Sequence, residues 1–362
     1  MPPSAKKQYN VSVRALQLPL GFLALGLFVY LLVKAKTIIL PLFMAVGIWY
    51  LINAIAKPIM NFRIGGRKLP GFICYAASIA LLIFAIYMIT GLVSRNIDNV
   101  VKRAPHYQQN LEMMFTKTVE KLHLENPLSI KDMAGYFDIG RILRDLAGTF
   151  TGLAGTAFVV FVYVAFLLYE QRTFDRKIAG ISSSRAQEKR IRSILRSIDT
   201  KIRTYLGVKT FVSALTGLIS FGIMKWVGVD FADFWGLIIF FLNFIPMLGS
   251  IVAVIFPALL TLVQFDTIGP FLVIAIGLTG TQIAIGNFLD PRMMGQSLNL
   301  SPIVILTSLA TWGTIWGIPG MFLSIPIMVI VTITLSQFRA TRPIAILLSE
   351  KGQLSKLDAD PA

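Results

Sequence analysis

The chain has 362 residues, of which 55% are hydrophobic and only 14% are charged, and its mean hydropathy is +0.71. A soluble globular chain carries about 25% charged residues, so this composition excludes an ordinary soluble domain and predicts an all-α polytopic membrane protein. The net charge of +16 does not indicate nucleic acid as a partner, because membrane proteins collect basic residues in cytoplasmic loops. The single cysteine, Cys74, excludes an intramolecular disulfide.

The N-terminal block, residues 1–93, predicts three membrane spans. These are 16–33, 38–56 and 71–93, and the first two are expected to be joined by a tight turn at residues 34–36. The basic residues of the loops place the N- and C-termini in the cytoplasm. About eight helical segments are expected in the whole chain.

Residues 94–149 are polar and predict a small extracytoplasmic helical subdomain. Two helices fit this segment, residues 106–123 and 129–147, with a break at residues 125–127. The only two histidines, His106 and His123, lie too far apart for ligand spacing, so no metal site is expected.

A fourth span covers residues 150–170, and residues 171–207 predict a basic amphipathic helix in the cytoplasm. Its apolar residues recur at helical spacing from Ile191 to Tyr205, with arginines and lysines on the other faces. Such a helix either lies on an anionic leaflet or packs on neighbouring protein. Lys209 follows near the start of the next span, where we expect it to snorkel to the interface.

The C-terminal block, residues 208–338, contains two long apolar stretches that proline and glycine interrupt, residues 234–263 and 302–333. Two uninterrupted spans, 208–226 and 270–289, are also expected here, and residues 339–362 form a cytoplasmic tail. In a bilayer, broken helices persist where protein or a polar cavity satisfies the freed backbone groups. We therefore expect two re-entrant hairpins that hold a solute, with these residues at the breaks: Asn243, Pro246, Gly249, Pro319 and Gly320. The alternative is that proline and glycine are scattered in ordinary spans.

A polar face runs along the span that ends near Asp290. Gln282, Gly286 and Asp290 follow one another at a helical step of four, Asn287 flanks them, and Arg292 comes two residues later. Such a face avoids lipid, and it is a candidate to line a solute path or bind a coupling ion. The alternative is a packing face whose Asp290 pairs with Arg292 at the membrane interface.

Sequence signatures of soluble enzymes are missing from the chain. It has no HExxH zinc motif and no phosphate-binding P-loop. We therefore expect neither an enzyme nor a cofactor, and no ATP-driven pump on this chain.

Three blocks of the C-terminal half resemble a known family. They are 242–260 (LNFIPMLGSIVAVIFPALL), 290–304 (DPRMMGQSLNLSPIV) and 316–331 (WGIPGMFLSIPIMVIV), and they resemble the signature blocks of the autoinducer-2 exporter family. Residues 205–218 and 342–350 are similar to the branch that exports the quorum signal. The resemblance implies a homo-oligomeric protein of the bacterial inner membrane that exports a small polar signalling molecule. At Asp290 relatives often have glutamate, so the carboxylate is kept on a shorter side chain.

Three functional hypotheses follow from these features. The leading one is a secondary transporter that exports autoinducer-2 or a similar small polar metabolite, with protons or Na⁺ as candidate coupling ions. The second is a sodium (cation)/proton antiporter that uses Asp290 as the exchanging carboxylate. The third is a membrane scaffold without transport activity, whose outer subdomain and basic inner helix recruit partners.

Overall fold

The chain folds as an all-α polytopic membrane protein, as its sequence predicts. The computed structural model describes residues 19–21, 23–24, 26–61, 63–64, 67–122, 156–265, 267–295 and 298–353. Within these ranges, five helices are long and apolar enough to cross a membrane, and one bent helix pair would make a sixth. The five are Lys36–Met60, Gly71–Asn96, Arg185–Val227, Ile268–Met294 and Ile318–Ser336.

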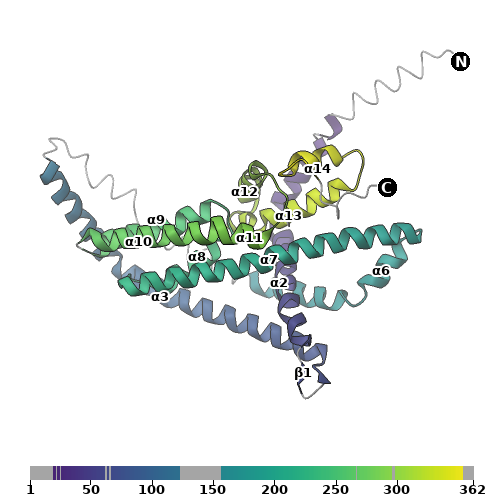
Figure 1. Ribbon diagram of the computed structural model, residues 1–362, viewed down its shortest axis with the longest axis horizontal. Helices are drawn as coiled ribbons and strands as arrows, with labels where there is room; N and C mark the ends of the chain where they lie inside the picture. The colour runs from purple at the N-terminus through teal and green to yellow at the C-terminus, as the bar shows by residue number, and fades with distance from the viewer. Residues whose placement is uncertain are drawn as a thin grey trace, which may run out of the picture.

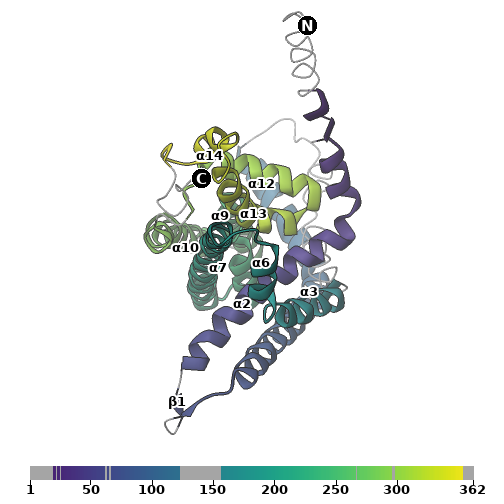
Figure 2. The ribbon, with the colours of Figure 1, turned by 90° about the vertical axis from the view of Figure 1, so that its right-hand side faces the viewer.

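The tight turn expected at residues 34–36 is wrong. The helix Pro19–Lys34 continues with a bend into α2 (Lys36–Asn61), as Figure 2 shows in purple. The Ala35 N–H donates to Leu31, and the Ala35 carbonyl accepts from Ile39, so helical hydrogen bonds run through the junction. Lysine and alanine favour helix, and the junction holds no proline or glycine to stop it.

Two short strands and a long helix follow α2. β1 (Arg63–Ile64) pairs antiparallel with β2 (Arg67–Lys68). α3 (Gly71–Leu122) then runs for 52 residues without interruption, so the expected third span and the first helix of the subdomain form one helix. The polar residues after position 93 end the apolar composition, but the helix continues through them, and even Pro105 does not end it. The helix expected at 129–147 lies outside the described residues.

The expected boundary between the basic helix and the fifth span is also absent. The helix Thr156–Glu170 bends by 66° into α6 (Phe174–Ile181). α7 (Arg185–Val227) then continues for 43 residues, from an N-cap at Ser184 to a left-handed Gly228. Charged residues become sparse near residue 208, but the helix propensity of the chain does not change there, so the helix continues. The division of the chain into domains stays a prediction.

The C-terminal part consists of a series of helices that pack beside α7. In order they are α8 (Ala232–Leu242), α9 (Leu248–Gln264), α10 (Ile268–Gln282), the π-helix η1 (Ile283–Leu289), α11 (Asp290–Met294), α12 (Pro302–Trp316), α13 (Ile318–Ser336) and α14 (Arg342–Leu348). α7 and α10 lie side by side along the long axis in Figure 1, and they are seen end-on together in Figure 2. α7 is therefore the helix around which this part is arranged.

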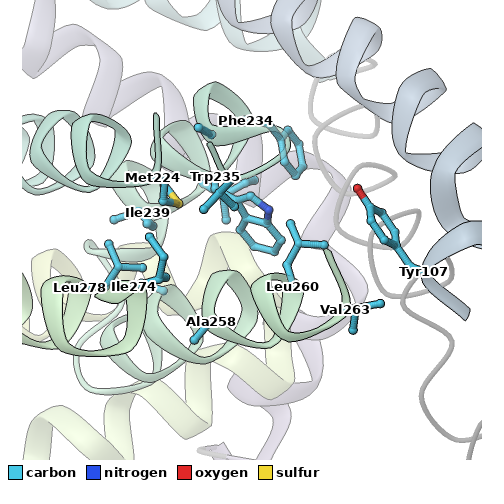
Figure 3. Close-up of a cluster of buried hydrophobic side chains, with 14 of the residues drawn as sticks. Tyr107, Met224, Phe234, Trp235, Ile239, Ala258, Leu260, Val263, Ile274 and Leu278 are labelled. Atoms are coloured by element: carbon cyan, nitrogen blue, oxygen red, sulfur yellow. The ribbon is translucent and has the colours of Figure 1, made fainter. Parts of the chain in front are cut away.

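Two buried clusters hold α7 in place. The first joins α7, α8, α9 and α10, and Tyr107 reaches it from α3 (Figure 3). The second joins α2, α7, α11 and α13, and the partly buried Ile194 and Ile198 of α7 pack against it. The apolar face of the basic segment thus packs on neighbouring protein, which was one of its two expected roles. Because lipid is as apolar as these side chains, close packing is the main stabilising contribution.

Candidate functional site

The first broken stretch reverses direction between α8 and α9. α8 has 11 residues, which span about 16 Å at 1.5 Å per residue and cannot cross a bilayer core of about 30 Å. Trp235 at the start of α8 stacks on Phe256 of α9, with ring centroids 6.2 Å apart, so the two helices run back along each other. A Cβ on Gly249 would lie 1.8 Å from the Leu242 carbonyl oxygen. Only glycine permits this reversal, because any side chain would overlap the backbone of α8.

The second broken stretch also reverses direction where a glycine packs against the backbone of the preceding helix. α12 ends at Trp316, Gly317 adopts a left-handed φ of +70°, and Pro319 lies in the first turn of α13. A Cβ on Gly320 would lie 1.9 Å from the Trp312 carbonyl oxygen. On either side of the turn, the Ser308 hydroxyl donates to the Ser324 carbonyl over 3.3 Å. Both stretches are therefore broken into helix pairs as predicted. Their re-entry into the membrane stays a prediction, because α13 is itself long and apolar enough to cross.

The turns of the two hairpins meet. Phe244 follows α8 at the first break, and Phe322 lies early in α13 after the second break. Their rings stack with centroids 4.4 Å apart and an interplanar angle of 21°. Residues separated by 78 positions in the sequence thus bring both breaks to one place.

The polar group of the first break is tied to α7. Asn243 is 6% exposed, and its side-chain amide donates to the Ser213 hydroxyl over 3.1 Å. One helical turn before Ser213 stands Lys209, which is 7% exposed. Ser213 and Lys209 thus form a polar line on α7. This line runs from the first hairpin to a buried ammonium group.

Asp290 is the partner of that ammonium. Lys209 Nζ lies 2.6 Å from Asp290 Oδ2, and the two side chains are 9% and 15% exposed. Lys209 does not snorkel as expected, because the membrane carboxylate pairs with it inside the protein. The alternative pairing of Asp290 with Arg292 is not what the structure shows, since Arg292 is exposed.

A π-helix places Asp290. The seven residues of η1 lie between Gln282 and Asp290, and π-helical turns are frequent at functional sites. A π-turn holds more residues than an α-turn, so the face expected from a step of four is rotated. Gln282 is buried and Gly286 half-buried, while Asn287 is exposed.

Three buried oxygens of α7 and the span Ile268–Met294 have no hydrogen-bond partner among the described residues. They are Asp290 Oδ1, Gln282 Oε1 and the Tyr205 hydroxyl. Tyr205 lies one turn before Lys209 on α7, and the Gln282 oxygen lies 4.0 Å from where a Cβ would stand on Gly286, one turn before Asp290. Buried polar atoms without partners are rare and point to a missing ligand or water.

The structure brings together only some of the residues expected in the path. Asn243 and Asp290 contact α7 one helical turn apart, at Ser213 and Lys209, and Gln282 is buried eight residues before Asp290. The turns contain the rest of the expected backbone positions: Pro246, Gly249, Pro319 and Gly320. Asn287 and Arg292 are exposed and stay outside the polar line. Whether these residues act on a solute stays a prediction.

Sequence reasoning missed the contribution of α7. Tyr205, Lys209, Ser213, Thr216 and Ser220 recur at steps of four, four, three and four, and all are buried. This spacing puts them on one helical face, and it could have been recognised in the fifth span. The apolar composition of that span concealed the stripe.

A second polar cluster connects the first hairpin to α3, at the end of the hairpin that lies away from its turn. Asp230, just before α8, accepts hydrogen bonds from Arg103 and Tyr107 of α3. The Asn110 amide donates to the Val263 carbonyl near the end of α9 over 2.8 Å. Burial, followed by the hydrogen bond to Asp230, raises the pKa of the Tyr107 phenol well above its ordinary value of 10.0.

No group of three or more His, Cys, Asp or Glu side chains that could hold a metal ion is present in the ranges that the structure describes. The site chemistry available here is hydrogen bonding and a compensated ion pair. Such an arrangement suits binding and passage of a small polar molecule.

Comparisons with known proteins agree with this architecture. The profile described as AI-2E family transporter matches residues 20–340. The AI-2 transport protein TqsA of Escherichia coli (strain K12) is 29% identical over 329 residues, which cover 87% of this chain and 90% of TqsA. A protein of Borreliella burgdorferi is 32% identical over 261 residues, 71% of each chain, and one of Haemophilus influenzae is 29% identical over 324 residues. Both carry only provisional names as transport proteins, without a solute. The chain therefore belongs to the AI-2E family of transporters, which is not an enzyme class.

Proposed function

We propose that the chain is a secondary transporter of the bacterial inner membrane that exports autoinducer-2 or a similar small polar signalling metabolite. The observation that carries the proposal is the convergence of both broken hairpins with a buried, hydrogen-bonding polar line on α7. Broken helices at membrane depth are where many transporters hold their solutes. The name of the TqsA relative supports the solute class.

In this mechanism the solute binds where the two hairpin turns face α7. The polar contacts come from Asn243 at the first break, from Asp290 beside Lys209, and from Gln282, eight residues before Asp290. The aromatic contact between Phe244 and Phe322 closes the path on one side, and moving the hairpins apart would open it. We further propose that both termini are cytoplasmic, that protons or Na⁺ supply the driving force, and that the protein is a homo-oligomer.

Accumulation in inside-out vesicles tests the proposal. Vesicles with the wild-type protein should accumulate autoinducer-2 in a gradient-dependent manner, whereas the Asp290→Asn, Asn243→Ala double variant should not. The exposed Asn287→Ala variant is the matched control and should transport normally. Accumulation no greater than in protein-free vesicles would argue against export, and normal accumulation by the double variant would remove these residues from the path.

The sodium/proton antiporter is the second candidate, and Asp290 Oδ1 is the observation in its favour. This buried carboxylate oxygen has no partner among the described residues and is placed to receive a proton or a cation. The ion pair with Lys209 opposes that role, because a metal cation that approached the carboxylate would meet the ammonium. Sodium-dependent proton movement in proteoliposomes, followed with a pH-sensitive dye, separates this function from export.

A further inference from the structure

The Lys209–Asp290 pair leaves the polar site with no net charge. The Lys209 ammonium and the Asp290 carboxylate are 2.6 Å apart, and both side chains are at least 85% buried between α7 and the span Ile268–Met294. Their nearest charged alternatives do not replace either partner: Arg292 is exposed, and Arg203 pairs with Asp199 on α7 itself. Each charge of the site therefore depends on the other for compensation.

The atoms around the pair are suited to hydroxyl groups. Asp290 Oδ1 and Gln282 Oε1 are acceptors without a donor in the described ranges, and the Tyr205 hydroxyl can both donate and accept. The Lys209 ammonium has three N–H donors, of which the bond to Asp290 uses one. One hydroxyl can donate to Asp290 Oδ1 and accept from Lys209 or Tyr205, and a second hydroxyl, nearer Gly286, can donate to Gln282 Oε1.

An ion of either sign fits this site poorly. A cation that approached the two oxygens would meet the Lys209 ammonium, and an anion that approached the ammonium would meet the Asp290 carboxylate. An uncharged solute meets neither penalty, and burial makes both penalties larger than they would be in water.

On the basis of the proposed transport function, we infer that the Lys209–Asp290 pair restricts this site to uncharged solutes with at least two hydroxyl groups and excludes both cations and anions by cancelling its own charge. The pair then acts as a selectivity element, and neither partner needs to change its protonation for the solute to pass. This deepens the proposed function by naming the chemical class that the site accepts.

Flux through proteoliposomes of the full-length protein tests the inference. The probes are ribitol as an uncharged polyol, radioactive Na⁺ and radioactive Cl⁻. The wild type should pass ribitol, and with no solute present it should pass neither ion. Lys209→Met leaves an uncompensated carboxylate and should raise Na⁺ flux by at least about tenfold, whereas Asp290→Asn leaves an uncompensated ammonium and should raise Cl⁻ flux by a similar factor.

Two further variants make the test decisive. Asp199→Asn breaks the half-buried Arg203–Asp199 pair on the same helix, whose side chains are 34% and 39% exposed, and it should change no flux. The exchanged pair, Lys209→Asp with Asp290→Lys, keeps the net charge at zero and should exclude both ions while still passing ribitol. If the single variants do not fold, as judged by gel filtration, the exchanged pair decides the question.

The inference is overturned if the folded single variants exclude both ions, if the exchanged pair conducts ions, or if the wild type conducts Na⁺ when no solute is present. These results are distinct from a failure of the proposed export. A wild type that transports ribitol while its single variants exclude ions contradicts only the selectivity role. A wild type that never moves autoinducer-2, with single variants that leak ions of the expected signs, contradicts only the export.

Discussion

The two hairpins share a turn but differ in what surrounds it. In each, a glycine lies against the carbonyl of the preceding helix, Gly249 on Leu242 and Gly320 on Trp312. The first hairpin carries a buried side-chain amide, Asn243, that donates to Ser213 of α7. At the end away from its turn, polar contacts connect it to α3. The second is lined by aromatic and aliphatic side chains. The comparison teaches that backbone geometry makes both hairpins, while polar chemistry is concentrated on one.

The second hairpin is anchored to the N-terminal helices. Trp316 is 1% exposed, its indole N–H donates to the Leu32 carbonyl over 3.2 Å, and its ring lies against Phe43. Leu323 and Ile327 of α13 complete this cluster. The first hairpin thus contributes the polar contacts of the proposed path, and the second contributes an apolar wall.

The largest effect should come from the turn glycines, and it should be equal in both hairpins. Gly249→Ala and Gly320→Ala each place a Cβ inside a carbonyl contact, so each should lower the free energy of unfolding by about 3 kcal/mol, the upper end of overpacking. Thermal unfolding in detergent measures the loss. Gly222→Ala in α7, where a Cβ meets nothing within 4 Å, is the control and should not destabilise. Normal stability of either turn variant would show that its hairpin is not built as described.

The stability that the Tyr107–Asp230 contact gives to the first hairpin should depend on pH. Tyr107→Phe removes a hydrogen bond to a charged acceptor, Asp230, and should cost about 1.5 kcal/mol at neutral pH. The folded pKa of Tyr107 lies above its unfolded value of 10.0, so its contribution is complete below pH 10 and is lost as the pH rises through the folded pKa. The variant should therefore lose stability less steeply above pH 10 than the wild type. Parallel curves from thermal unfolding at several pH values would contradict this.

A smaller effect should distinguish the polar groups of the two hairpins. Asn243→Ala leaves the Ser213 hydroxyl without its donor and should cost about 1 kcal/mol, with a strong loss of transport. Ser308→Ala in the second hairpin removes a longer hydrogen bond of 3.3 Å and should leave transport unchanged. Vesicle transport and thermal unfolding of both variants provide the comparison, and equal transport losses would show that the hairpins share the polar role.

The smallest effect should be the coupling between the hairpins. A double-mutant cycle with Phe244→Leu and Phe322→Leu should give an interaction free energy of about 0.5 to 1 kcal/mol, because stacked rings contribute beyond their buried area. Phe240, which meets Phe244 edge to face at 5.6 Å within the first hairpin, provides a reference cycle. A coupling energy of zero between Phe244 and Phe322 would show that the two hairpin turns do not stabilise each other.

The sequence predicts the broken hairpins because proline and glycine interrupt otherwise apolar helices, and these residues act locally. It also predicts Asp290 as a polar group in a span. The partner Lys209 could not be identified, because a basic residue near the start of a span has two outcomes and tertiary packing chooses between them. The extents of α3 and α7 were missed for a related reason: hydropathy marks where lipid begins, whereas polar residues can continue a helix, and α3 runs on even through Pro105.

Cross-linking between the hairpin turns tests the central claim, which is that both breaks close on one path. In a background with the single cysteine replaced, Cys74→Ala, the pair Phe244→Cys and Phe322→Cys should react quickly with a short bismaleimide, and the cross-link should stop transport. A control pair, Phe244→Cys with the exposed Trp226→Cys, should not cross-link. Failure of the turn pair to react, or transport that continues at the full rate after complete cross-linking, would contradict the account.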